Sequence, residues 1–171
     1  RKPRQAFRAA ASATNKPYAP VTLPLNDRSV DLITSSMVVS QFDFEPFSYF
    51  LKRLMEHDMG LIQKDQVVLE KMELELRDKL FTVQLEGHCQ EMLRLLAPDG
   101  RIYFSMETLH QAGTDAPWFQ PEIVPKAMEV LGKYFYFDMD SVERLETSDR
   151  ITTPTGGKSL IQAHVLMPKP H

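Results

Sequence analysis

Cysteine is nearly absent from this chain, and so is any long apolar run. Cys89 is the one cysteine among 171 residues, so an internal disulfide is excluded and a reducing, intracellular compartment is favoured. No apolar run approaches the roughly 18 residues that a transmembrane helix needs, so we expect no membrane span. The net charge of -3, with 25% charged residues, argues against a general nucleic-acid-binding protein but leaves room for a local basic patch.

Glycine is also scarce, and its spacing excludes the usual nucleotide-binding turn. A nucleotide-like cofactor in a doubly wound α/β fold lies against a glycine-rich turn after the first strand, because only glycine lets the backbone approach so closely. The chain has seven glycines, at positions 60, 87, 100, 113, 132, 156 and 157, and they form no GxGxG motif or relative of it.

Two apolar, β-rich runs about 70 residues apart predict neighbouring strands. The first, at 30–39, follows a polar turn at 26–29 and is apolar on both faces, as in a central parallel strand that helices cover on both sides. The second, at 101–105, follows an amphipathic helix that ends in a Pro-Asp-Gly turn. Strand, helix, turn and strand together predict a βαβ unit.

These two segments also resemble a known family. LPLNDRSVDLI at 23–33 and LRLLAPDGRIYFS at 93–105 look like the second half of a class I S-adenosylmethionine-dependent methyltransferase. The resemblance covers 23–171 and lacks the family's front end. It implies an α/β domain at 23–171, with a partial Rossmann-like sheet of the family's fourth to seventh strands in the order fourth, fifth, seventh, sixth. We also expect helices that flank the sheet, a helical insertion at about 58–84 and an extended basic arm at 1–22.

The resemblance assigns some cofactor contacts and leaves others without a counterpart. It implies that Ser35, Ser36 and Met37 face the methionine end of S-adenosylmethionine, with Asp31 as the acid at the start of the strand. The alternative interpretation involves no cofactor. In it, Asp31 is a strand-entry residue that caps a turn, and Ser35 and Ser36 are small residues at a strand end. The glycine-rich turn, the acid for the ribose and the acid for the adenine are missing; the last would fall within 18–22, which reads YAPVT. We therefore predict that this chain alone binds no cofactor and is inactive.

A long helix is predicted from Asp65 to about Leu96. Its about 32 residues would span about 48 Å, with one apolar stripe in the first half and a second stripe, Leu85, Cys89, Met92 and Leu96, facing the sheet. Gly87 is expected to mark a bend or break between the two halves. The first half is longer than a minimal sheet needs, so it meets a partner, forms a lid or caps its own domain.

The remaining elements follow from local patterns. Helices are predicted at about 46–57 and 121–131, a loop at 106–117, and strands at 134–139 and 159–167, with a segment of uncertain type at 142–147. A hairpin turn at 155–158 predicts that the last strand is antiparallel to its predecessor. Although GGKS at 156–159 ends like a phosphate-binding loop, the motif would require glycine where Thr152 stands. The five histidines are scattered, and no metal site is predicted.

The first 26 residues contain five bases and no acid. Such a composition is typical of a mitochondrial targeting segment or its remnant, or of a disordered basic tail. We expect a mitochondrial matrix location, with the cytoplasm as the alternative, and contact with RNA through residues 1–16.

Three functional interpretations remain open. The first is a methyltransferase-like, non-catalytic structural or accessory subunit of a larger assembly, which binds protein partners through the 65–83 helix, the arm and the open edge of the sheet. The second is an active S-adenosylmethionine-dependent methyltransferase whose cofactor-binding half lies outside this sequence. The third is an unrelated α/β binding module, because such βαβ units occur in many folds.

Overall fold

The computed structural model describes residues 22–36, 66–113, 115–149 and 157–170, and also positions 5–6, 8–9, 12, 38, 42, 48–49 and 52–53. Within 66–69 and 147–149 it describes the backbone course only. The described residues exclude Met37, most of the arm and most of the helix expected at 46–57.

The fold is α/β, as predicted, with a mixed four-stranded sheet. The strands are β1 (Val30–Ser36), β2 (Leu96–Gln111), β3 (Phe135–Asp149) and β4 (Gly157–Pro168), and their order in the sheet is β1-β2-β4-β3. β1 is parallel to β2, whereas β2 and β3 are both antiparallel to β4. The antiparallel ending of the chain is therefore confirmed, and β1 and β3 are the two edges of this sheet.

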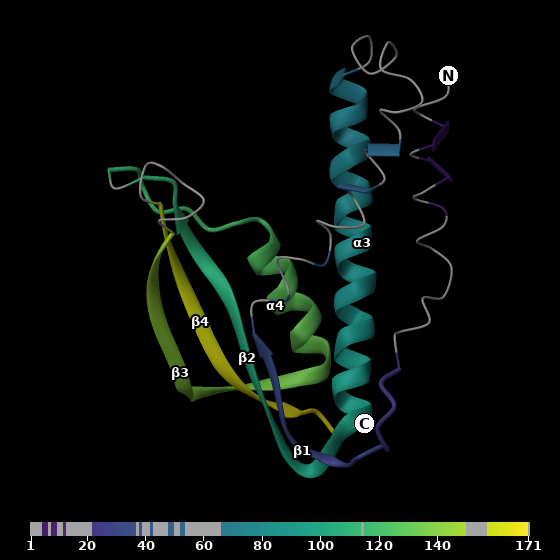
Figure 1. The fold of residues 1–171 in the computed structure, drawn as a ribbon, viewed down its shortest axis with the longest axis vertical. Coiled ribbons are helices and arrows are strands. Elements are labelled where there is room, and N and C mark those ends of the chain that lie inside the picture. The colour runs from purple at the N-terminus through teal and green to yellow at the C-terminus, as the bar shows by residue number, and fades with distance from the viewer. Residues whose placement is uncertain are drawn as a thin grey trace.

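Two helices pack against one face of the sheet (Figure 1). These are α3 (Gln66–Leu95) and α4 (Ile123–Tyr134). The predicted second stripe is confirmed as core: Leu85, Cys89 and Met92 of α3 are buried, and so is Leu96, which is the first residue of β2. The other core residues of α4 and the sheet are Val124, Ala127, Val130, Leu131, Ile102, Phe104, Met106, Phe135 and Leu166. Figure 1 shows that the first half of α3 continues beyond the strands, as expected.

The bend predicted at Gly87 is wrong. α3 is one continuous helix of 30 residues, and Gly87 is buried within it. A single glycine costs a helix only about 1 kcal/mol relative to alanine. Burial of the flanking residues Leu85 and Cys89, each 0% exposed, offsets that cost.

The sheet is larger than the sequence patterns predict. The loop expected at 106–117 is wrong over its first part, because β2 continues to Gln111, which pairs with Lys158 of β4. The segments at 134–139 and 142–147 form one strand, β3, with a register shift between Asp138 and Glu143. Ser141 stabilises this irregularity: its hydroxyl accepts a 3.2 Å hydrogen bond from the Val165 amide and donates to the Asp138 carbonyl.

The predicted Pro-Asp-Gly turn lies within an irregular stretch between α3 and the regular part of β2. Val30 pairs with Leu96 and Leu32 pairs with Arg101, so the residues between Leu96 and Arg101 form a bulge. A Cβ atom on Gly100 would lie 2.7 Å from the side chain of Leu96. This close approach explains why glycine is needed there.

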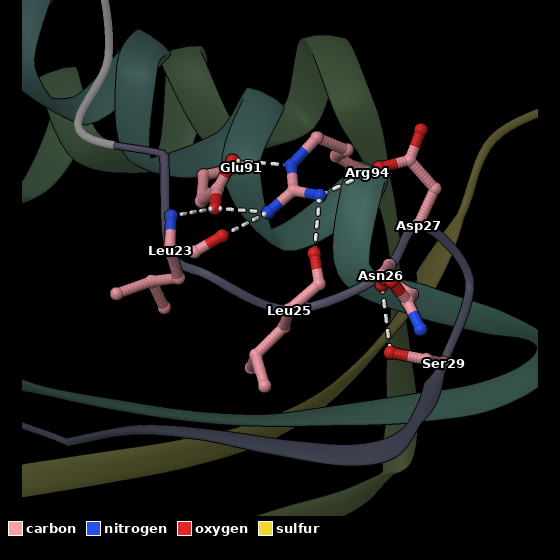
Figure 2. Close-up of polar contacts among 7 residues, drawn as sticks. All are labelled: Leu23, Leu25, Asn26, Asp27, Ser29, Glu91 and Arg94. Carbon is pink, nitrogen blue, oxygen red and sulfur yellow. Dashed lines mark hydrogen bonds and ion pairs between the residues drawn. The ribbon is translucent and has the colours of Figure 1, made fainter.

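A polar cluster attaches the segment before β1 to the end of α3 (Figure 2). The Arg94 guanidinium donates two hydrogen bonds to the Glu91 carboxylate, at 2.7 and 2.8 Å, and one of 2.6 Å to Asp27. It also donates to the carbonyl oxygens of Leu23 and Leu25, while Glu91 accepts the Leu23 amide at 2.8 Å. Chiefly through the Arg94 hydrogen bonds, the pKa of Glu91 is lowered to about 2. The cluster thereby fixes where β1 enters the sheet.

Candidate functional site

The face of the sheet opposite α3 and α4 carries a mixture of exposed apolar and polar side chains. Side chains alternate between faces along a strand, so Ile102 and Phe104 point into the helical core while Tyr103 and Ser105 point the other way. In the described part of the chain, no helix covers this second face. Leu32 and Leu145 are both 61% exposed, and each belongs to an outer strand.

A row of small residues crosses this second face. Ser36 of β1 pairs with Ser105 of β2, Ser105 with Ala163 of β4, and Ala163 with Glu143 of β3. The Ser36 and Ser105 hydroxyl oxygens lie 2.8 Å apart in a hydrogen bond. Because the side chains of the first three residues are short, the row forms the floor of a cavity of about 490 Å³. Its lining residues are Ser36, Tyr103, Ser105, Glu143, Arg144, Leu145, Ile161 and Ala163.

Tyr103 spans the cavity from β2 to β3. Its hydroxyl donates a 3.1 Å hydrogen bond to Glu143, passing over the intervening strand β4. Desolvation, followed by the Glu143 carboxylate, raises the pKa of Tyr103, so the phenol stays protonated and remains a donor. One end of the cavity thus contains a carboxylate held by a phenol, and the other end contains two hydroxyls.

A second polar pair lies on the helical side of β1. The Ser35 hydroxyl and the Nε2 atom of His88 on α3 are 2.9 Å apart in a hydrogen bond, and the Phe42 ring lies edge-on to the imidazole at 5.4 Å. Burial lowers the pKa of His88, which favours the neutral imidazole. Ser35 is only 3% exposed and His88 is half-buried, so this hydrogen bond satisfies the polar groups of both side chains.

The structure separates the site residues that the sequence analysis groups together. Ser35 points toward α3, whereas Ser36 lies in the cavity. Asp31 is exposed and lies five residues from Ser36 along β1, which is roughly 17 Å in a strand. Met37 lies outside the described residues. Of the three predicted residues that the structure describes, Ser36 alone lines the cavity.

Sequence analysis missed Ser105, Tyr103, Glu143 and His88. Alternation along β2 does place Tyr103 and Ser105 on a common face. Their proximity to Ser36 and Glu143, however, depends on strand register between segments up to 107 residues apart, and no local pattern encodes that register.

The described residues fit S-adenosylmethionine poorly. Ser36 and Ser105 offer hydroxyls near the carboxyl end of β1, which suit polar groups of a ligand, and Glu143 offers one acceptor. Among the residues that the structure describes, no glycine lines this cavity, and no second carboxylate beside the serines is available to hold a ribose.

A scan against protein-family models and a search of curated proteins found no match for this chain. Among the described residues, no helix is both long enough and apolar enough to cross a membrane. In the same residues, no three side chains of His, Cys, Asp or Glu come together as metal ligands would.

Proposed function

We propose that this chain is a methyltransferase-like domain that serves as a non-catalytic structural or accessory subunit of a larger assembly. The observation that carries the proposal is the strand order β1-β2-β4-β3, with β1 parallel to β2 and an antiparallel ending. The methyltransferase resemblance implies this order and these directions. Proteins of unrelated activity can share a topology of this kind. The strand order therefore supports the methyltransferase-like fold, and it does not indicate that the chain transfers methyl groups.

Surfaces available for partners support the subunit role. β1 is an edge strand beside a parallel neighbour, and parallel pairs are usually covered on both faces and continued on both sides. On α3, Leu74 is 61% exposed and borders a cavity of about 430 Å³ between α3 and α4. We propose partner contacts at the 65–83 helix, the β1 edge and the basic arm, with RNA contact by residues 1–16 and a setting in the mitochondrial matrix.

The alternative is an active methyltransferase whose glycine-rich cofactor loop lies elsewhere in a longer polypeptide. The position of the cavity favours it: Ser36 and Ser105 lie near the carboxyl end of the parallel pair, where ligands of open α/β sheets bind. In this interpretation the cavity is part of a larger site that upstream residues complete.

Two measurements decide between these functions. The first is the intact mass of the polypeptide and the mass of its native complex, both from the natural source. The second is calorimetric titration of the purified protein with S-adenosylmethionine. A subunit role predicts a polypeptide near 19.6 kDa in a larger complex, with no micromolar binding. A longer polypeptide that binds the cofactor and transfers a methyl group would overturn this role and establish the alternative.

A further inference from the structure

One stretch of the edge strand β3 combines exposed apolar side chains with an excess of acids. In this stretch, defined as residues 138–146 and called the β3 surface, Met139 is 73% exposed and Leu145 is 61% exposed. Its acids are Asp138, Asp140, Glu143 and Glu146, and its one base is Arg144. The neighbouring Tyr136 differs from this stretch, because the Lys169 ammonium lies 5.2 Å from the centre of its ring.

Most of these acids lack a cationic partner within the described part of the chain. Glu146 is the exception, because Lys158 lies 2.7 Å from its carboxylate. Glu143 accepts a hydrogen bond from the neutral Tyr103 hydroxyl, and Asp138 accepts one from the Asp140 amide. The β3 surface therefore retains uncompensated negative charge next to exposed apolar area.

The cavity on the second face opens beside this stretch. Glu143, Arg144 and Leu145 line it together with the shallow floor at Ser105 and Ala163. A side chain that enters over this floor meets apolar surface from Leu145 and Ile161 and reaches the Glu143 carboxylate. Such a hollow suits a long side chain with an apolar stem and a positively charged end, which is the form of lysine and arginine.

We propose that the β3 surface and its adjoining cavity bind a basic amphipathic helix of a partner protein, with one lysine or arginine directed at Glu143. A sheet face with exposed apolar side chains is normally buried against another layer, and an amphipathic helix is one of the elements that form such a layer. Opposite charge selects a basic partner. A second copy of this surface fits less well, because it would bring two acidic stretches together. The proposal rests on the subunit role and names one contact surface for it.

The test uses the protein of 171 residues and two synthetic peptides. One is an amphipathic helix of leucine and lysine, and the other replaces every lysine with glutamate. Fluorescence anisotropy measures binding of each labelled peptide. We expect the lysine peptide to bind and the glutamate peptide not to bind. Asp140→Asn/Glu143→Gln is expected to weaken binding about tenfold, and Leu145→Ser by a similar factor.

Matched variants outside the β3 surface control for net charge and exposed apolar area. Asp99→Asn/Glu129→Gln removes the same charge from two exposed positions, and Leu25→Ser removes a leucine that is 50% exposed. Both are expected to change the affinity by less than about twofold. Equal weakening by the β3 variants and these controls, or no weakening by the β3 variants, overturns the proposal, as does equal binding of both peptides.

Two further results would assign the surface to another occupant and would also overturn the proposal. One is self-association in sedimentation equilibrium that Leu145→Ser abolishes, which would mean that a second copy binds there. The other is tighter peptide binding by Arg4→Gln/Arg8→Gln, which would mean that the chain's own basic arm occupies the surface. The mass of the native complex tests the subunit role separately, so failure of the peptide contact is distinguishable from failure of that role.

Discussion

The Tyr103 hydroxyl on β2 and the Glu143 carboxylate on β3 form a 3.1 Å hydrogen bond across the intervening strand β4. On β4, Tyr103 pairs with Val165 and Glu143 pairs with Ala163, so the phenol crosses β4 diagonally toward the short Ala163 side chain. The same short side chain forms part of the cavity floor. Ala163 thus leaves room both for the cross-strand contact and for the hollow beside it.

Replacing Glu143 should change the ionisation of Tyr103. In Glu143→Gln the phenolate no longer faces a negative charge, so we expect the pKa of Tyr103 to fall toward its usual value. Desolvation, the larger cause of the raised pKa, remains and keeps it from falling completely. Ultraviolet absorbance during alkaline titration measures the change, with Tyr103→Phe to identify the signal. An unchanged pKa in Glu143→Gln would contradict the observed contact.

The stability of the fold should fall at mildly acidic pH because of His164. This side chain is 5% exposed and packs edge-on to Phe137, and both of its ring nitrogens are buried without a hydrogen-bond partner. Burial lowers its pKa, and that of His88, below the usual 6.5. The unfolded chain therefore binds the proton more readily, so stability is full above pH 6.5 and decreases as the pH drops below it.

Two substitutions of His164 separate its charge from its unpaired nitrogens. His164→Phe removes both, so we expect a weaker dependence on pH and a gain of about 1 kcal/mol in unfolding free energy near neutral pH. His164→Asn keeps polar atoms but cannot be protonated at these pH values, so it should weaken the dependence to the same extent without that gain, because His88 remains in both variants. Urea unfolding between about pH 5 and 8 measures both. A wild-type slope in both variants would assign the dependence to His88 alone.

The cluster of Arg94 and Glu91 should control how firmly the segment before β1 is held. Arg94→Met removes the hydrogen bonds from the guanidinium to Leu23, Leu25 and Asp27. The hydrogen bond from the Leu23 amide to Glu91 remains. Arg94→Lys retains the charge but loses the paired geometry. We expect both to lower the urea midpoint, Met more than Lys. Arg101→Met is the control, since within the described part of the chain the Arg101 guanidinium donates hydrogen bonds to the nearby Asp99 and Gly100 carbonyls and none to residues 23–27.

This cluster also predicts the acid limit of stability. The pKa of Glu91 is lowered to about 2 from 4.5, so its stabilising effect is present above pH 4.5 and is lost as the pH falls toward 2. In Arg94→Met the pKa of Glu91 is no longer lowered by the guanidinium, so Glu91 contributes less stability above pH 4.5. The difference in unfolding free energy between wild type and variant should therefore shrink as the pH falls toward 2. Urea unfolding followed by circular dichroism at a series of acidic pH values measures this difference, and a difference that stays constant with pH would contradict the prediction.

The core contact between α3 and the sheet should be sensitive to truncation. Leu85 is 0% exposed, so Leu85→Ala is expected to lower the unfolding free energy by about 2–5 kcal/mol through lost burial and the cavity created. Leu74 on the same helix is 61% exposed, and Leu74→Ala should change it by no more than about 0.5 kcal/mol. Comparable losses in urea unfolding would mean that Leu74 is buried in the protein as it exists in solution.

The helices and the last strand follow closely from the sequence. The helix predicted at 65–96 spans 66–95, the helix at 121–131 spans 123–134, and the strand at 159–167 spans 157–168. These elements carry their own signals: apolar residues recur with the helical or strand period, and turn residues bound them. The stripe of Leu85, Cys89 and Met92 identified the buried side of α3 in the same way.

The longer strands needed partners that lie far along the chain. Nothing in 106–111 distinguishes a strand from a loop until β4 pairs with it, and β3 continues past its irregularity because Ser141 bonds to Val165. For the site, period-two alternation separates Ser35 from Ser36 in any strand. The cavity itself required the register that aligns Ser36, Ser105, Ala163 and Glu143.

The sequence by itself determined the α/β class, the long helix and its buried stripe, because these depend on spacing within one segment. Only the tertiary structure decided that a row of small residues crosses the second face and that the acidic stretch of β3 lies beside the resulting cavity. The physical reason is register: hydrogen-bonded pairing of distant strands selects which side chains become neighbours, and each strand sequence alone is compatible with several alignments.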